Sequence, residues 1–195
     1  MNLQPLDQLF YNKPTLELAR ALLGKLLVKE TEEGVAAGWV VETEAYVGPE
    51  DRAAHSFGNR RTQRTEVMFG PAGRVYTYVM HTHCLVNVVS ANIGEPEAVL
   101  IRAVEPYIGL DLMYKRRGKD KKEKDLTNGP GKLTKALGIE KADYGRSLTE
   151  RPLFIAEGPE PESISTGPRI GIDNSGEAKE YPWRFWVSGN PFVSG

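Results

Sequence analysis

Two glutamates and a tyrosine alternate with apolar residues in the segment VVETEAYV (40–47). Alternate side chains of an extended strand face opposite ways, so Glu42, Glu44 and Tyr46 are predicted to share one face. Because a carboxylate can take a proton from water, this strand can present a general base on its polar face. The other face carries small or apolar side chains typical of a protein core: Val41, Thr43, Ala45 and Val47.

Three later segments also alternate between an apolar face and a face with polar or aromatic side chains. They are RVYTYVM (74–80), CLVNVVS (84–90) and AVLIRA (98–103). If these strands share a sheet with 40–47, one face suits a nucleobase that is stacked between rings and read along its edge. The residues alone also permit an ordinary wet sheet face. The second faces carry Tyr76, Tyr78, Met80, Asn87, Leu100 and Arg102.

Helical and turn signals complete a mixed α/β (α+β) pattern. A helix is predicted over 15–23, which precedes Gly24, and an antiparallel hairpin joins 25–30 to 35–47. We expect one compact domain over residues 1–195, with a curved, mainly antiparallel sheet flanked by helices. The remaining predictions are a helix over 105–116 starting at Glu105-Pro106, a mobile loop over 117–130, a short helix over 131–139, and strands near 152–156, 168–172 and 183–188.

The composition favours a soluble protein of a reducing compartment. Cys84 is the single cysteine, so no intramolecular disulfide can form. The first residues lack the basic and apolar regions of a signal peptide, and no run of about 18 apolar residues is present. We expect a cytoplasmic monomer that does not contact a membrane.

Charge is unevenly distributed along the chain, although the net charge is only −1. Residues 60–141 hold 15 Lys and Arg against 9 Asp and Glu, whereas the other residues hold 10 against 17. One sector can therefore face phosphates while the rest of the surface repels them. A run such as KRRGKDKKEKD (115–125) is also typical of a solvated loop, so charge alone does not decide the partner.

The stretch ETEAYVGPEDRAAHS (42–56) closely resembles the core motif of the alkyladenine (3-methyladenine) DNA glycosylases. Further similar pieces occur in the family's order along nearly the whole chain. The resemblance implies an enzyme that flips a damaged purine out of double-stranded DNA and cuts its bond to the sugar, without a cofactor or a metal. These pieces are LARALLGKLLV (18–28), MFGPAGRVYTY (68–78), NVVS (87–90), VLIRAVEP (99–106), NGPGKL (128–133), PRIGI (168–172) and PWRFWVSGNPFVS (182–194).

The resemblance also implies the reaction. Glu44 corresponds to the carboxylate that deprotonates the attacking water, and Arg102 to an arginine near that water and the phosphate of the target nucleotide. The expected substrates are alkylated or deaminated purines: 3-methyladenine, 7-methylguanine, hypoxanthine and ethenoadenine. No lysine or amino-terminal proline in the matching motifs can serve as a Schiff-base nucleophile, so the product is expected to be an abasic site in an intact strand.

Other matching residues are expected to enclose the flipped base. Tyr46 and Tyr78 correspond to the rings that stack on it from either side, and His55 to the residue at its edge. Asn87 corresponds to the amide that helps to exclude guanine through its 2-amino group. Two apolar positions that line the family's pocket correspond to Leu100 and Ile170.

The chain departs from the family at the residue that fills the gap left by the flipped base. Family members commonly place a tyrosine there, within a Tyr-Gly-Met stretch. The segment YTYVMHTHCLVN (76–87) is one residue shorter and offers Met80 or His81 as the DNA wedge. Methionine suits this role because apolar wedges part base steps in other proteins.

Three alternatives compete with this interpretation. A metal site could combine His81 and His83 with Glu42 or His55, but an isolated His-x-His is weak evidence. A non-catalytic nucleic-acid-binding module could use the same scaffold, although it would gain nothing from Glu44 facing phosphates. A small-molecule hydrolase would leave the basic sector unexplained. Glu42 itself is expected to be structural, paired with an arginine or a backbone donor.

Overall fold

The computed structural model describes residues 3–194, and eight strands within that range form one antiparallel sheet. The strand order is β3-β4-β5-β2-β1-β6, while β8 joins β2 and also pairs with β7. Residues 1, 2 and 195 of the predicted domain lie outside the described residues. The strands are β1 (Leu26–Thr31), β2 (Gly34–Tyr46), β3 (Val75–Met80), β4 (His83–Ser90), β5 (Glu97–Ile108), β6 (Leu153–Ala156), β7 (Ile164–Gly167) and β8 (Arg184–Val187).

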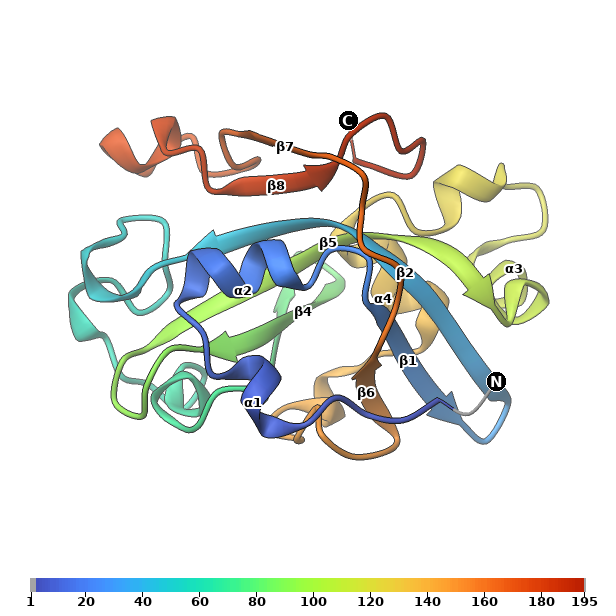
Figure 1. Cartoon of the computed structure of the whole chain (residues 1–195), viewed down its shortest axis with the longest axis horizontal. Coiled ribbons are helices and arrows are strands. Elements are labelled where there is room, and N and C mark those ends of the chain that lie inside the picture. The colour runs from blue at the N-terminus through green and yellow to red at the C-terminus, as the bar shows by residue number, and fades with distance from the viewer. Residues whose placement is uncertain (1–2, 195) are drawn as a thin grey trace.

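The 13-residue strand β2 organises this sheet. One of its edges pairs with β1 over 34–39 and then with β8 over 42–44, and the other edge pairs with β5. Register shifts near Gly38 and between Val40 and Thr43 mark bulges, which bend and twist a strand. Figure 1 shows β2 and β5 crossing the molecule together, with β7 and β8 along one side. The prediction of a curved, antiparallel sheet is confirmed.

The bulges change one predicted face of β2. Glu42 and Glu44 do share a face, since Arg102 contacts both carboxylates. Val41 was expected beside Thr43 and Ala45, but it packs in a separate apolar cluster with Ala103 and Phe192. The extra residue at a bulge breaks strict alternation, and the sequence pattern cannot show this.

Helices cover the apolar face of the sheet. The Thr43 hydroxyl donates to the Ala19 carbonyl oxygen of α2 at 2.8 Å. Helix α4 begins at Pro130 and ends before Gly138, whose φ of 78° is the left-handed conformation that favours glycine. The helices predicted over 15–23 and 131–139 are confirmed, with ends that differ by one or two residues. The helices are α1 (Gln8–Tyr11), α2 (Thr15–Ala21), α3 (Leu110–Arg117) and α4 (Pro130–Leu137), with short 3-10 turns at Gly48–Glu50, Phe57–Asn59, Glu66–Phe69, Glu123–Leu126, Lys141–Asp143 and Gly176–Glu180.

The helix predicted over 105–116 was wrong in its first half. Strand β5 continues to Ile108, and Pro106 pairs with Gly38. Proline is tolerated in this strand because β4 pairs with β5 only as far as Leu100, so the other edge of β5 needs no amide donor at residue 106. The helix α3 starts after Gly109, where a φ of 77° turns the chain.

Two further predictions need correction. No strand forms at 168–172, because Gly171 is left-handed and the Ile170 amide donates to Glu44 instead of a neighbouring strand. The segment 117–130 is not simply an exposed loop, since Leu126 and Thr127 are fully buried within it. Among the described helices, none is long and apolar enough to cross a bilayer.

Candidate active site

A cavity of about 440 Å³ opens beside the polar side chains of β3, β4 and β5. This volume is within the usual range for a small-molecule site, about 300–1,000 Å³. The structure brings eight of the ten predicted site residues to its wall; of the other two, Glu44 lies directly behind the wall and His81 lies at the tip of a hairpin. The eight are Tyr46, His55, Tyr78, Met80, Asn87, Leu100, Arg102 and Ile170.

Strand pairing explains why residues so distant in sequence meet here. Tyr76 lies opposite Asn87, Asn87 opposite Leu100, and Leu100 opposite Glu44, so one row of side chains crosses four strands. Arg184 of β8 continues the row on the far side of Glu44. Directly paired residues in a sheet lie within side-chain contact, which makes this row one continuous surface.

Glu44 is fully buried and is held by three donors. Its Oε1 accepts the Ile170 amide at 2.7 Å, and its Oε2 accepts the Tyr46 hydroxyl at 2.8 Å. Arg102 Nη1 lies 3.3 Å from Oε1. Burial raises the pKa of Glu44, whereas Arg102 and the two hydrogen bonds favour its ionised form. Three residues of the cavity wall thus hold a carboxylate that can accept a proton.

Glu42 and Arg102 form the structural layer beneath Glu44. Glu42 is fully buried, with Oε1 3.0 Å from Arg184 Nη1 and 3.3 Å from Arg102 Nε. Its Oε2 accepts the Ser194 amide at 2.8 Å. Glu42 was predicted to pair with an arginine or a backbone donor, and it contacts both kinds of partner. Arg102 consequently bridges both carboxylates and holds them at fixed positions.

Aromatic rings and a histidine form another wall of the cavity. The His55 ring lies 4.6 Å from the Tyr78 ring, nearly at right angles to it, and His55 Nδ1 is 2.7 Å from the Tyr76 hydroxyl. Burial, with help from Arg64 and Arg60, lowers the pKa of His55 to about 4. His55 is therefore neutral at physiological pH and offers one donor and one acceptor. Burial also raises the pKa of Tyr78 to about 12.

The amide of Asn87 has a fixed orientation on the cavity wall. Its Nδ2 donates to the Tyr76 carbonyl oxygen at 3.0 Å, across the paired strands β3 and β4. Asn87 is almost fully buried, so its remaining polar atoms are available only to a group that enters the cavity.

The two candidate wedge residues lie at the tip of the β3–β4 hairpin. Met80 is 49% exposed and lines the cavity, on the same face as Tyr78. His81 is exposed in the turn, where it adopts a φ of 56° that is uncommon for a residue other than glycine. Val79, on the opposite face, contributes to a different cavity.

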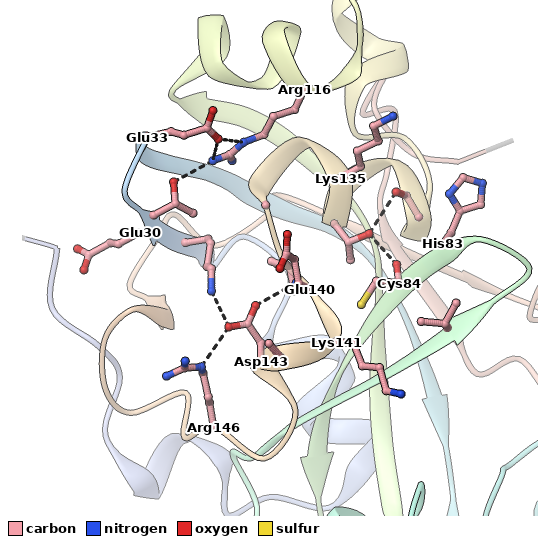
Figure 2. Close-up of a pocket in the computed structure, with 18 of the residues that line it drawn as sticks. Glu30, Glu33, His83, Cys84, Arg116, Lys135, Glu140, Lys141, Asp143 and Arg146 are labelled. Carbon is pink, nitrogen blue, oxygen red and sulfur yellow. Dashed lines mark hydrogen bonds and ion pairs between the residues drawn. The ribbon is translucent and has the colours of Figure 1, made fainter.

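That second cavity, of about 790 Å³, lies behind the hairpin (Figure 2). Opposite charges pair within it: Asp143 contacts Lys29 at 2.5 Å and Arg146 at 3.1 Å. None of the predicted site residues lines it. His83 lines this second cavity, whereas His55 and Glu42 do not. Among residues 3–194, no three His, Cys, Asp or Glu side chains come together as a metal site would require.

Sequence reasoning missed several residues that line the first cavity or lie directly behind its wall. Tyr76 was placed on the polar face but given no role, although it lines the cavity and contacts His55. Asp51 and Arg169 form a fully buried ion pair directly behind Tyr46. The signal was present in the matching pieces GPEDRAAHS and PRIGI, which contain both residues. The segment 173–175, which closes one side of the cavity, gave no such signal.

The fold and this site define a class of protein. A buried carboxylate and an arginine stand beside a cavity walled by aromatic rings, an arrangement suited to hydrolysing the bond between a nucleobase and its sugar. A family model described as methylpurine-DNA glycosylase matches residues 9–191. The chain belongs to this family, so the resemblance of its motifs is confirmed, and it is a DNA glycosylase.

Similar proteins from several bacteria support this assignment. One from Bacillus licheniformis is 70% identical, covering 98% of this chain and 97% of the relative. One from Bacillus subtilis strain 168 is 66% identical, covering 97% and 96%. One from Listeria monocytogenes serotype 4b is 48% identical, covering 96% and 90%. Each of the three carries the name "Putative 3-methyladenine DNA glycosylase".

Proposed function

We propose that this protein acts as a monomer on double-stranded DNA, flips out alkylated or deaminated purines and releases them with a water activated by Glu44. The substrates are 3-methyladenine, 7-methylguanine, hypoxanthine and ethenoadenine. The observation that carries the proposal is the position of Glu44, held by the Ile170 amide and the Tyr46 hydroxyl behind a cavity walled by rings.

The reaction requires negative charge close to the sugar. An N-glycosidic bond breaks through a state in which the sugar carries positive charge, so a carboxylate can both stabilise that state and orient the attacking water. Glu44 supplies the carboxylate, and Arg102 and the Ile170 amide favour its ionised form. Arg102, which lines the cavity, also presents a cation toward the phosphate of the flipped nucleotide.

Selectivity for damaged purines follows from the other walls. A purine nucleotide methylated at N3 or N7 is cationic, which strengthens its stacking on the electron-rich rings of Tyr46 and Tyr78. His55 is neutral and does not repel it. Asn87, whose side chain is held on the wall by its hydrogen bond to the Tyr76 carbonyl oxygen, is expected to leave no room for a guanine 2-amino group. Such clashes against normal bases add discrimination.

The surface next to the cavity suits a phosphate backbone. Arg64 and Lys141 line a small cavity that shares Tyr78 with the site. Both belong to the basic sector 60–141. Cations at this distance from the flipped base can hold the flanking phosphates and fix the register of the duplex.

A binding module without catalysis is the second candidate, and the burial of Glu44 argues against it. Burying a carboxylate costs free energy unless it is compensated, and here the arginine, the amide and the hydroxyl are all engaged in compensation. A protein that only holds DNA gains nothing from this arrangement, because the carboxylate repels the phosphates it must bind.

Duplexes that each carry one of the four lesions test the proposed substrates and product. The purified protein is expected to release the free base and leave the strand unbroken until alkali is added, because no amine lies in the cavity wall where it could form a Schiff base. Base release is measured by chromatography and strand cleavage by denaturing gel. Cleavage before alkali treatment would contradict the proposed product, and no release from any duplex would contradict the activity.

The position of the wedge is tested by Met80→Ala and His81→Ala. Because Met80 lies at the mouth of the cavity, M80A is expected to slow release from a fully paired duplex about tenfold, or about 1.4 kcal/mol, with a much smaller effect on a lesion in single-stranded DNA. The effect differs because a wedge residue is needed only where the target base must leave the base stack of a duplex. If H81A causes the larger paired-duplex defect, His81 is the wedge.

A further inference from the structure

Arg169 and Asp51 form an ion pair with no solvent exposure of either side chain. Arg169 Nη1 contacts Asp51 Oδ2 at 2.5 Å, and Nη2 contacts Oδ1 at 2.9 Å, so two parallel hydrogen bonds fix the relative orientation of the groups. The pair lies outside the wall of the base cavity, and neither the predicted roles nor the proposed reaction uses it.

The pair ties together four segments that surround the site. Arg169 also donates to the carbonyl oxygens of Ala45, at the end of β2, and Ala178, in the 3-10 turn Gly176–Glu180. Asp51 also accepts the amides of Val47 and Ala53, at 3.2 and 3.0 Å. The end of β2, the turn after it, the segment around 169 and the turn around 178 are therefore held as one unit.

This unit contacts the stacking ring from behind. The Arg169 guanidinium lies over the Tyr46 ring, 4.7 Å from its centre, and 5.1 Å from the centre of the Trp183 ring. Tyr46 itself lines the base cavity. A flat, immobile guanidinium behind the ring restricts its tilt, so the opposite face of Tyr46 is presented to the base at a fixed angle.

The same unit also sets the position of a donor to Glu44. Ile170 directly follows Arg169, and its amide lies 2.7 Å from Glu44 Oε1. With Arg169 anchored on both sides by Asp51 and Ala45, the next peptide has little freedom to turn away. The pair thus acts on both the stacking ring and the carboxylate.

Stability alone does not account for such a pair. Two charges removed from water recover their desolvation cost only with complete hydrogen bonding, and apolar residues of similar volume often stabilise a protein equally well. Arg169 Nε is buried without a hydrogen-bond partner, so compensation is incomplete. Lysine could not replace arginine, because an ammonium group offers neither the parallel hydrogen bonds nor a flat surface for Tyr46.

We propose that Arg169 and Asp51 are positioning residues, which hold the Tyr46 ring against the flipped base and the Ile170 amide against Glu44. This inference rests on the proposed function of the site. It makes a specific prediction about pH: when the Ile170 amide moves away, the ionised form of Glu44 loses a donor and base release fails at a higher pH than in the wild type. The other titratable or charged groups beside Glu44 are Glu42 and Tyr46 on β2, Arg102 on β5, Tyr78 on β3 and Arg184 on β8.

The experiment compares Asp51→Asn and Arg169→Lys with a matched control, Asp143→Asn. Asp143 is also a buried partner of a cation, Lys29, but its side chain faces the other cavity (Figure 2). D51N and R169K are expected to slow single-turnover base release from a 3-methyladenine duplex about 10²-fold, the scale expected when catalytic groups are misplaced by about 1 Å. The acid limb of the rate profile is expected to move toward neutral pH. D143N is expected to lower Tm without changing the rate of base release or the position of the acid limb.

Each outcome decides between positioning and a purely structural role. If D51N and D143N lose similar Tm and show the same small change in rate, with the acid limb unmoved, the positioning role is overturned. If neither D51N nor R169K folds, the pair is a requirement of the fold and the inference is likewise overturned. If the wild-type protein releases no base from any methylated duplex, the proposed function itself is overturned. If the wild type is active and D51N is equally active, only the positioning role of the pair is overturned.

Discussion

Glu44→Gln is expected to reduce single-turnover base release by about 10²- to 10⁴-fold, the usual contribution of a general base. Glutamine has nearly the same shape and can still accept the Ile170 amide through its oxygen, so the Tyr46 and Tyr78 walls of the cavity remain in place. The Kd for a lesion-bearing duplex is therefore expected to stay near the wild-type value. Rates measured with enzyme in excess and binding measured by fluorescence anisotropy separate the two effects.

The matched control for this variant is Glu97→Gln. Glu97 is another carboxyl group whose pKa is raised by burial, but it contacts Thr15 and lines a different hollow. E97Q is expected to release bases at the wild-type rate. Near-normal turnover by E44Q would falsify the role of Glu44, and equal losses in E44Q and E97Q would show that the assay reports stability and not catalysis.

The same substitution has an effect on stability that depends on pH. Burial raises the pKa of Glu44 in the folded protein above that of the unfolded chain. Such a group adds stability below its unfolded pKa and loses that contribution as pH rises through its folded pKa. The Tm of E44Q relative to the wild type is therefore expected to be higher at about pH 8 than at about pH 5. Keeping Glu44 ionised therefore lowers the stability of the folded protein, and the ionised carboxylate is the form that base release requires.

Much of the site was predictable because strand alternation needs no knowledge of the tertiary structure. The placement of Tyr78 and Met80 on one face of β3, and of Leu100 and Arg102 on one face of β5, followed from side-chain periodicity. The family resemblance then assigned a role to each residue. Periodicity could not show that β8 would pair beside Glu44, since that contact depends on where β1 leaves the edge of β2.

The errors share a physical cause. The sequence pattern predicts a helix start at Pro106 because local sequence signals do not show which strand edges are already paired. It predicts a strand over 168–172 because such signals show neither that Gly171 is left-handed nor that the Ile170 amide donates to Glu44. Arg169 and Asp51 were missed for a related reason. Asp51 occurs in a polar, turn-rich stretch and Arg169 in a segment predicted to be a strand, and only the tertiary structure buries both as a pair.

Arg102→Met is expected to cause the largest loss of stability, because it removes the cation that lies between two fully buried carboxylates. Removing one partner of a buried ion pair typically costs about 3–5 kcal/mol. Arg184 still pairs with Glu42, but the remaining donors of Glu44 are the Ile170 amide and the Tyr46 hydroxyl. Urea unfolding at about pH 7.5 measures the loss, with Arg116→Met as the control.

Arg116 suits this purpose because its side chain is about as buried as that of Arg102, at 11% and 9% exposed, yet its partner Glu33 is 43% exposed. R116M leaves no carboxylate buried, so we expect a smaller loss that is nearly independent of pH.

R102M is expected to raise the pKa of Glu44 further, since Arg102 is the largest influence that lowers it. The deficit of R102M should then shrink as pH falls toward about 5 and the carboxyl group takes up a proton, while the acid limb of base release moves to higher pH. A deficit that is constant with pH would mean that Arg102 stabilises the fold through packing, and that Glu44 does not depend on it for its charge.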